Sequence, residues 1–238
     1  MQSIFKRYEK KYLITQEQGT ILQKLIAQNM VIDQLGDYLV QNLYYDTANW
    51  DIIRESIEKP MYKEKLRLRF YGQYNPKSQG FLELKKKFKG VVCKRRISFP
   101  LSELKKHSVR EIVAADNSQI SRELDFFLQN NPVSEKIYIA YKRIAYTYLG
   151  DNDLRITFDK DIYFHPAPLD NYNPAYGCQI IDQNQMLMEI KTTGAIPIWL
   201  ARMLSEKHIF PASFSKVGVC YTRFVFKQQD LEEDMNVA

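Results

Sequence analysis

Polar and apolar residues alternate along the stretch from Tyr62 to Phe99. In its first run every second residue is cationic and the residues between are apolar; the cations are Lys65, Arg67 and Arg69. Successive side chains of a β-strand point to opposite faces of the sheet. The run therefore predicts a strand with one apolar face and one strongly basic face.

Two later runs of this stretch repeat the alternation. One face of the run from Phe81 to Phe88 carries Glu83, Lys85 and Lys87, and one face of the next run carries Lys94 and Arg96. Solvated sheet faces usually mix charges of both signs, because like charges directly opposite each other repel. Acidic residues are scarce here, so these faces favour a bound polyanion over a merely solvated outer surface.

The rest of the chain also divides into strand-like and helix-like segments. Strands are predicted over Ile4–Ile14, Tyr38–Tyr45, Lys136–Tyr148, Leu154–Phe164 and Gln185–Thr192. Helices are predicted over Gln16–Gln28, Trp50–Ile57, an interrupted segment Ser102–Leu128, and Pro197–His208. Thr15 followed by Gln18 is typical of a capping box, and Asp46 or Thr47 can cap the second helix.

Length and composition limit the number of domains and the kind of partner that the chain can have. No linker divides the 238 residues, so a single domain is predicted over residues 1–227, followed by a frayed polar tail at 228–238. Lys and Arg number 34 against 28 Asp and Glu, which gives a net charge of +6 and a pI near 9.0. This balance favours an anionic partner without naming it.

Several classes of protein are disfavoured. No apolar run approaches the roughly 20 residues that cross a bilayer. The segment Met1–Tyr12 is charged rather than signal-like, so a cytoplasmic location is expected. Cys93, Cys178 and Cys220 are widely spaced and His residues are few, which supports neither a disulfide framework nor a zinc site.

Strands outnumber helices, and nearly every predicted strand has one charged face. The fold class is therefore predicted as strand-dominated α+β: a closed antiparallel β-barrel of about eight strands with helices packed outside. Closing the sheet would gather the cations into one lumen. Because burying unpaired cations is costly, that lumen has to be a wet tunnel that takes a ligand.

The order of short charged motifs resembles the triphosphate tunnel metalloenzymes, a CYTH-like superfamily. The motifs are Glu9-x-Lys11, Arg67-x-Arg69, Glu83-x-Lys85, Lys94-x-Arg96, Arg143, Arg155, Glu189-x-Lys191 and Ser213-Phe214-Ser215-Lys216. Within that superfamily the chain is most similar to the VTC domain, the catalytic domain of the vacuolar transporter chaperone complex, and to its bacterial relatives. The resemblance covers roughly residues 4 to 225.

The resemblance implies transfer of the γ-phosphoryl group of ATP onto inorganic polyphosphate in a basic tunnel. It implies substrate contacts from Lys11, Arg67, Arg69, Lys85, Lys94, Arg96, Arg143, Arg155, Lys191 and Lys216. Of these, Arg67, Arg69, Lys85, Arg143 and Arg155 would also be catalytic, together with Glu189. Glu189 would be the ligand of a divalent metal, Mn²⁺ or Mg²⁺.

The chemistry suits these residue types on general grounds. Phosphoryl transfer depends mainly on positioning and on cations that neutralise the transferred group. A phosphate acceptor is already ionised at neutral pH, so no general base is needed. Mg²⁺ and Mn²⁺ prefer oxygen ligands, and one carboxylate with substrate phosphates is enough to hold one.

Two positions depart from the patterns of the superfamily. Hydrolytic tunnel enzymes commonly begin with Glu-x-Glu-x-Lys, whereas Arg7 stands at the first glutamate position. The lost carboxylate could help a second metal activate water, so transfer is favoured over hydrolysis. Ser213 stands where the yeast-type pattern has a lysine, which removes one tunnel cation.

Other interpretations stay open. Glu189 could merely pair with Lys191 or an arginine. The outward-facing cations Lys10, Lys86, Arg95 and Lys142, and the aromatic residues Tyr12, Tyr44, Tyr45 and Trp199, are interpreted as surface and packing groups. The alternative functions are a metal-dependent tripolyphosphatase or nucleoside triphosphatase, and a barrel that holds polyphosphate without turnover. Nucleic acid is not expected, because inward cations cannot reach a duplex. The oligomeric state is open, and a membrane-protein partner is compatible with the resemblance.

Overall fold

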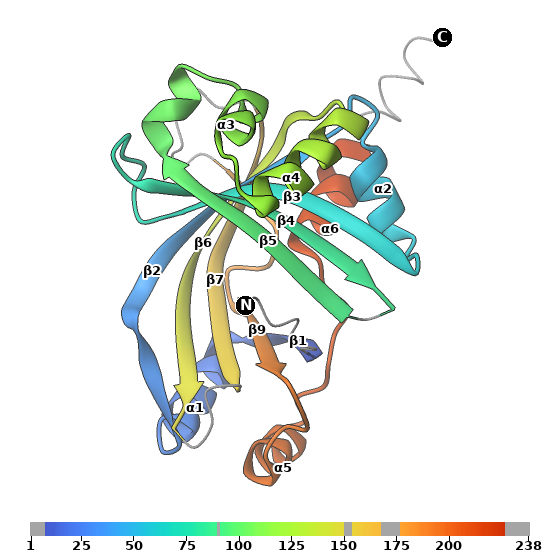
Figure 1. The fold of residues 1–238 in the computed structure, drawn as a ribbon. Helices are drawn as coiled ribbons and strands as arrows, with labels where there is room; N and C mark the ends of the chain where they lie inside the picture. The colour runs from blue at the N-terminus through green and yellow to red at the C-terminus, as the bar shows by residue number, and fades with distance from the viewer. Residues whose placement is uncertain (1–7, 90, 150–153, 168–176, 227–238) are drawn as a thin grey trace, which may run out of the picture.

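A nine-stranded antiparallel sheet organises the described part of the chain (Figure 1). The computed structural model describes residues 8–89, 91–149, 154–167 and 177–226. The strands, in their order across the sheet, are β1 (Tyr8–Thr15), β9 (Gln185–Thr192), β7 (Arg155–Pro166), β6 (Ser134–Tyr148), β2 (Met30–Asp46), β3 (Tyr62–Tyr71), β4 (Gln79–Phe88) and β5 (Val91–Pro100). The short β8 (Cys178–Gln179) pairs with β7. The strand-dominated α+β class is thereby confirmed.

Most helices pack on the outside of this bent sheet. The helices are α1 (Gln16–Ile26), α2 (Asp51–Ile57), α3 (Val109–Ala115), α4 (Gln119–Asn130), α5 (Ile198–Glu206) and α6 (Lys216–Cys220), with a 3-10 helix at Leu101–Lys105 and a π-helix at Tyr221–Val225. The first turn of α6 reaches the concave face of the sheet instead. In Figure 1, α3 and α4 cover the outer face of β3 to β5, and α1 and α5 lie at the opposite end of the sheet. Among the described residues, no helix is long and apolar enough to cross a membrane.

Helix ends follow the local sequence signals. The Thr15 hydroxyl accepts a hydrogen bond from the backbone N–H of Gln18, and the Gln18 side chain accepts one from the backbone N–H of Thr15, so the predicted capping box is present. The Asp46 carboxylate accepts hydrogen bonds from the backbone N–H groups of Ile52 and Ile53, at 3.0 and 2.9 Å. These acceptors satisfy backbone N–H groups that have no partner within a helix.

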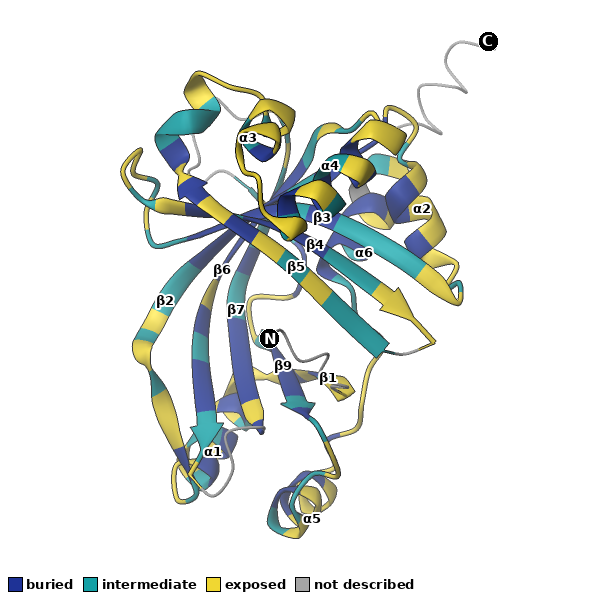
Figure 2. Ribbon diagram, viewed as in Figure 1, coloured by how far each residue is buried: buried dark blue, intermediate teal, exposed yellow. Residues whose placement is uncertain are grey.

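The alternation seen in the sequence separates the two faces of the sheet. Leu66, Leu68, Leu82 and Leu84 are fully buried in a core cluster with residues of α3 and α4. The charged residues Lys65, Arg67, Arg69 and Lys85, which alternate with these leucines, point to the concave face. Figure 2 shows this division as bands of buried and more exposed residues along β3 to β5.

The predicted closed barrel is not observed. The sheet ends at β1 and β5, and no hydrogen-bonded ladder joins these two strands in the described residues. The chain after α5 occupies the outer edge of β1 instead: the backbone N–H of Ala212 donates to the Lys11 carbonyl at 2.7 Å. A closing strand would need this same edge, so the concave face is completed by segment 211–217 and by side chains.

Strand β2 is longer than predicted, because its first half breaks the alternating pattern. The pairing between β2 and β6 shifts register between Ile32 and Asp37, and Gly36 has φ 62. Such an irregularity bends a strand without ending it. The first residues of the predicted strand Ile4–Ile14, the position of Arg7, the turn at 150–153 and the tail 228–238 lie outside the described residues.

Candidate functional site

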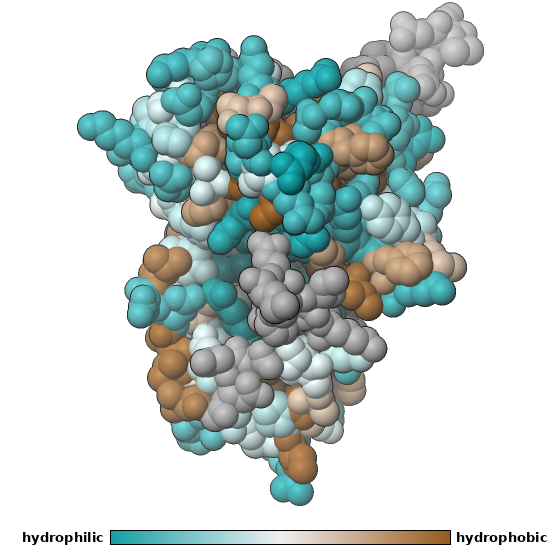
Figure 3. Space-filling model, viewed as in Figure 1, coloured by the Kyte–Doolittle hydropathy of each residue, from teal (hydrophilic) through white to brown (hydrophobic). Residues whose placement is uncertain are grey.

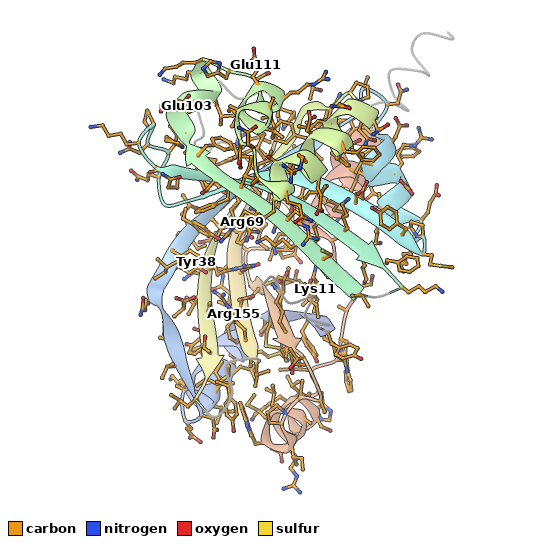
Figure 4. The ribbon with its side chains drawn as sticks, viewed as in Figure 1. Lys11, Tyr38, Arg69, Glu103, Glu111 and Arg155 are labelled. Atoms are coloured by element: carbon orange, nitrogen blue, oxygen red, sulfur yellow. The ribbon has the colours of Figure 1, made fainter. Side chains whose placement is uncertain are left out.

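The concave face of the sheet encloses a polar cavity of about 130 Å³. It is lined from β1, β2, β3, β4, β6, β9 and the first turn of α6; the lining residues are Glu9, Lys11, Tyr44, Lys65, Arg67, Arg69, Lys85, Tyr141, Arg143, Glu189, Lys191, Ser215, Lys216 and Val217. Cations outnumber carboxylates in this lining. In Figure 4, Lys11, Tyr38 and Arg69 lie toward the concave side, away from Glu103 and Glu111.

Asp159 of β7 anchors two of the lining cations. Its carboxylate is fully buried and accepts hydrogen bonds from Arg143 at 2.6 and 2.7 Å and from Lys216 at 2.6 Å. Burial alone would raise the pKa of Asp159, but the charges of Arg143 and Lys216 outweigh it and lower the pKa. Arg143 and Lys216 are thereby held charged and in fixed positions although they are themselves buried.

Glu189 of β9 sits among cations from several elements. Its carboxylate oxygens lie 3.1 Å from the ammonium of Lys191, 3.5 Å from that of Lys216 and 3.7 Å from that of Lys11. An Arg143 nitrogen lies 4.0 Å away. Burial opposes ionisation of Glu189, but Lys191 and Lys216 outweigh it and lower its pKa well below the usual range. The carboxylate is therefore ionised, and no single cation is its exclusive partner.

Glu83 of β4 is another buried carboxylate that is surrounded by cations. Its oxygen Oε2 accepts a hydrogen bond from Nε of Arg67 at 2.9 Å and lies 2.9 Å from Nη2, and Oε1 contacts Lys94. Burial would raise the pKa of Glu83, but Arg67 and Arg69 outweigh it and lower the pKa to about 2. The two-point contact fixes the plane of the Arg67 guanidinium.

Neutral groups orient further arginine side chains. The Asn42 amide oxygen accepts from Nε of Arg69 at 2.9 Å, and the Tyr44 hydroxyl accepts from Arg67 at 3.2 Å. The ring of Tyr141 lies 4.5 Å from the ammonium of Lys216. The contacts to Arg67 and Arg69 leave other guanidinium N–H groups that can bind an anion in the cavity.

Glu9 of β1 contacts a lysine of β4 across the concave face. Its carboxylate lies 3.5 Å from Lys11 on its own strand and 3.6 Å from Lys85 on β4. Burial would raise the pKa of Glu9, but Lys85 and Lys191 outweigh it and lower the pKa to about 2. An ion pair thus joins β1 to β4, where the backbone ladder is absent.

Burial disfavours the charged forms of Lys65 and Lys85, which both lie near Lys11. Burial, followed by repulsion from Lys11 and Lys63, lowers the pKa of Lys65 to about 7. Burial also lowers the pKa of Lys85 to about 8, against the pull of Glu9. The Lys85 side chain is 39% exposed, so water also stabilises its charged form. A bound anion would favour the charged form of both.

A lysine-rich groove of about 910 Å³ continues from the cavity to the surface. It shares Glu9, Lys11, Lys65, Lys85 and Ser215 with the cavity lining, and its other lysines are Lys10, Lys59, Lys63, Lys87 and Lys89. Figure 3 shows hydrophilic side chains gathered near the middle of the visible face. The cavity is therefore open at this end to a long anion.

The predicted site residues are brought together with few exceptions. Lys11, Arg67, Arg69, Lys85, Arg143, Glu189, Lys191 and Lys216 line the cavity. Lys94 and Arg96 lie at its rim and contact Glu83. Arg155 faces the same side of β7 as Asp159 but does not line the cavity; its side chain is 44% exposed and pairs with Asp33 at 2.7 Å. Arg155 is the first residue of β7 and lies opposite Lys191 of β9, but its side chain turns to Asp33 of β2 instead.

Further residues of the site were not predicted, among them Lys65, Tyr44, Tyr141 and Asp159. Lys65 belongs to the same alternating run as Arg67, so its spacing could have identified it. Tyr44 was interpreted as a packing residue, but its hydroxyl contacts Arg67. Tyr141 and Asp159 had no signal of their own, because their partners Lys216 and Arg143 come from other elements.

Three of the four cations predicted to face outward pair with carboxylates that lie outside the cavity. Arg95 pairs with Glu123 of α4 at 2.8 Å, Lys86 with Glu64 at 3.3 Å, and Lys142 with Asp161 at 3.0 Å. Lys10 is different because it borders the lysine-rich groove. These pairs explain why the basic strands of this chain have no exposed all-cationic outer face.

The donor set can hold a hard divalent cation only with help from a ligand. Glu9 and Glu189 both face the cavity and both lie beside Lys11. Mg²⁺ and Mn²⁺ accept one or two carboxylates when phosphate oxygens and waters supply the rest. The described residues contain no group of three His, Cys, Asp or Glu that could hold a metal on its own. A metal would therefore share these carboxylates with a phosphorylated substrate.

Known protein sequences are similar to this chain. A family model described as VTC domain matches residues 6–225. Vacuolar transporter chaperone complex subunit 2 of Saccharomyces cerevisiae is 26% identical over 153 residues, and its Schizosaccharomyces pombe counterpart is 24% identical over 136 residues. These matches cover 54% and 50% of this chain, which spans only 18% of the length of either relative.

Solved structures share the fold. A Hippeastrum protein, described as an adenylyl cyclase candidate with a dominant triphosphatase activity, superposes with a TM-score of 0.53 at 18% identity, over 90% of this chain and 94% of that one. A Pyrococcus horikoshii protein superposes with a TM-score of 0.50 at 13% identity, over 91% and 99%. At this level of identity the likeness concerns the fold alone.

Proposed function

Since the chain belongs to the VTC domain family, we propose that it transfers the γ-phosphoryl group of ATP onto an inorganic polyphosphate chain. The observation that carries this proposal is the enclosed cavity in which Arg67, Arg69, Arg143 and Lys216 converge around a space large enough for phosphate groups. Glu83 orients Arg67, and Asn42 orients Arg69. Arg143 and Lys216 both donate to Asp159. Fixed cations of this kind suit the transfer of a charged phosphoryl group.

The role proposed for each residue depends on where it lies in the site. The guanidinium groups of Arg67, Arg69 and Arg143 would bind the phosphoryl oxygens and neutralise the charge that is redistributed during transfer. Lys65 and Lys85, at the end that opens into the groove, would hold the acceptor end of the polyphosphate chain. The acceptor oxygen is ionised at neutral pH, so the site needs no group to remove a proton from it.

A divalent cation, Mn²⁺ or Mg²⁺, is part of this proposal. Glu189, together with Glu9, would hold it beside the substrate. When bound, it would neutralise phosphate charge and orient the transferred group. Lys11 and Lys191, which contact these carboxylates in the free protein, would then be released to bind phosphate oxygens.

The lysine-rich groove would carry the growing chain. Lys63 of β3, Lys87 of β4, and Lys59 and Lys89 in the adjoining chain border it. Lysines act as mobile point charges, so they can hold a polyphosphate without fixing its position. This arrangement supports a polymeric product over a single inorganic phosphate.

We also propose a cytoplasmic location, where ATP is abundant; all three cysteines are free thiols. By analogy with the yeast subunits, which are named for a vacuolar transporter chaperone complex, a membrane-protein partner could receive the product.

Two other functions fit the same cavity. A tripolyphosphatase or nucleoside triphosphatase would use the same cations but would transfer the phosphoryl group to water. A polyphosphate-binding barrel without turnover is favoured by one observation: the carboxylates Glu9 and Glu189 are already engaged by lysines. The phosphatase would release free phosphate, and the binding barrel would release no product. Both outcomes differ from that of a polymerase.

Incubation with ATP and Mn²⁺, with separate assays for ADP, free phosphate and long-chain polyphosphate, distinguishes the three. ADP together with polyphosphate supports the polymerase. ADP together with an equal amount of free phosphate supports a phosphatase. Tight binding of polyphosphate without any ADP supports the binding barrel.

We expect Arg67→Ala to weaken tripolyphosphate binding by roughly tenfold to a hundredfold, because it removes a fixed guanidinium from the cavity wall. Turnover should fall with it. The matched control is Arg95→Ala, which removes an outward arginine on β5 paired with Glu123. Isothermal titration of both variants measures the difference, and equal affinities would exclude Arg67 from the site.

We expect binding of long-chain polyphosphate to take up protons near neutral pH. The pKa of Lys65 is lowered to about 7 in the free protein, and a bound anion raises it again. The internal phosphates of the chain stay ionised, so affinity should fall as the pH rises from about 6 to 9. Titration calorimetry in buffers of different ionisation enthalpy measures the uptake.

Lys65→Gln should reduce this proton uptake, and Lys86→Gln, an outward lysine paired with Glu64, should leave it unchanged. Uptake that is the same in wild type and Lys65→Gln would refute the assignment of the titration to Lys65.

A further inference from the structure

A row of aromatic side chains crosses the concave face beside the arginines of the cavity. Tyr38 of β2 contacts Tyr71 of β3 edge-on, with ring centroids 5.9 Å apart, and Tyr71 contacts Phe81 of β4 at 5.8 Å. The guanidinium of Arg96 on β5 then lies 4.6 Å from the centroid of the Phe81 ring. The three aromatic residues and Arg96 therefore form a row with one residue from each of four neighbouring strands. The proposed phosphoryl transfer does not use this row.

The row lies next to the phosphate-binding cations and on the side away from the lysine-rich groove. Phe81 pairs directly with Arg69, and Tyr38 pairs directly with Arg143. Cross-strand partners have Cβ atoms about 5 Å apart. Along β3 the order is Lys65, Arg67, Arg69 and then Tyr71, so lysines and aromatics mark opposite ends of the site.

The end of the row is accessible. Phe81 and Arg96 line a hollow of about 490 Å³ together with Lys94, Ile97 and Ser98. Phe81 is half-buried, and 45% of the Arg96 side chain is exposed. The Tyr38 and Tyr71 rings pack against an apolar cluster, so their role is to hold Phe81 in place rather than to contact a ligand.

The Arg96 side chain is oriented from two sides. A nitrogen of its guanidinium lies 3.8 Å from the Glu83 carboxylate, and its planar head covers part of the Phe81 ring. A guanidinium held over an aromatic ring presents a flat cationic surface on its other side. Purine bases stack on such surfaces and on aromatic rings.

We propose that this hollow binds the base of the nucleotide donor, stacked against Phe81 and Arg96. The inference rests on the proposed function, because it needs a nucleoside triphosphate whose phosphates occupy the arginine cavity. The donor then has one orientation: its base lies at Phe81, its phosphates run past Arg69 and Arg67, and its terminal phosphate points toward Lys65 and Lys85. The acceptor chain approaches from the lysine-rich groove.

This orientation explains why the hollow at Phe81 and the lysine-rich groove differ in chemistry. A stacked base needs a flat apolar or cationic surface, which Phe81 and Arg96 supply at one end. An inorganic chain has no apolar part, and the groove at the other end offers it lysines. Stacking depends little on the identity of the base, so ATP and GTP should bind with similar affinity.

The test compares ATP with inorganic tripolyphosphate, which has the phosphates but no base. In Phe81→Leu, the dissociation constant for ATP should rise by about tenfold relative to that for tripolyphosphate. Arg96→Lys keeps the charge and removes the planar surface, so it should shift the same ratio in the same direction. The matched control is Phe88→Leu, which truncates an exposed phenylalanine at the far end of β4. Titration calorimetry without metal measures all four proteins.

The outcomes separate this inference from the proposed function. If wild type binds tripolyphosphate but Phe81→Leu and Arg96→Lys leave the ratio unchanged, the base site is wrong and the phosphate site stands. If the wild type binds neither ligand, the proposed function fails and the base site fails with it. A shift in the ratio for Phe88→Leu equal to that for Phe81→Leu would also overturn the base site.

Discussion

We expect Asp159→Asn to lower the free energy of unfolding by about 3 to 5 kcal/mol, because it leaves buried cations without their counterion. Asp159 is fully buried and accepts from both Arg143 and Lys216. The amide keeps the shape of the side chain but carries no charge. Urea unfolding near neutral pH measures the loss, and saturating tripolyphosphate should restore part of it by supplying an anion that binds only the folded state.

The pH dependence of this loss has a definite sign. The pKa of Asp159 is lowered in the folded protein, so its contribution to stability is present above the ordinary aspartate pKa, about 4, and is lost at lower pH. The difference between wild type and Asp159→Asn should therefore shrink in acid.

Asp161→Asn is the matched control for this effect. Asp161 lies on the same strand and pairs with Lys142 at 3.0 Å on the surface, where its side chain is 32% exposed. An exposed pair contributes about 0 to 1 kcal/mol. Equal losses in Asp159→Asn and Asp161→Asn would show that the buried cations do not depend on Asp159.

We expect Glu189→Gln to lower ATP turnover by roughly a hundredfold or more, while tripolyphosphate binding stays as tight as in wild type. Glu189 is an anion among Lys11, Lys191, Lys216 and Arg143, so it cannot itself attract a phosphate. Removing its charge raises the positive potential of the cavity and removes the carboxylate proposed to hold the metal. ADP release at saturating Mn²⁺ and calorimetry with tripolyphosphate measure the two effects separately.

The control for Glu189→Gln is Glu64→Gln, which neutralises a carboxylate paired with Lys86 on the outer face of β3. It should change neither quantity. Wild-type turnover in Glu189→Gln would remove the metal assignment, and with it most of the case for an enzyme over a polyphosphate-binding barrel.

Local patterns were enough to predict most elements. The capping box at Thr15 and the alternation through Lys65, Arg67 and Arg69 depend only on neighbouring residues, and both correspond to elements of the structure. The first half of β2 was missed, because Asp33, Gly36 and Asp37 interrupt its apolar pattern where the strand shifts register. Helix α6 was missed as well, since Lys216–Cys220 is too short to show helical periodicity.

The candidate site was predictable only in part. Strand alternation assigned Arg67, Arg69 and Lys85 to one face, and the structure places all three at the cavity. Asp159 and Asp161 are two residues apart, so alternation alone puts them on the same face. Asp161 has φ 52, and the pairing of β6 with β7 shifts register nearby. That irregularity turns Asp161 outward to Lys142 and leaves Asp159 inside with Arg143.

The sequence by itself determined which strands have a basic face and an apolar face, because a two-residue period is a property of the extended backbone. Tertiary structure alone decided which charges share the cavity. Lys216 meets Asp159 from a different element, and the N–H of Ala212 occupies the edge of β1 that a closed barrel would have needed. Buried cations require counterions at contact distance, and only the folded chain brings together residues that lie this far apart in the sequence.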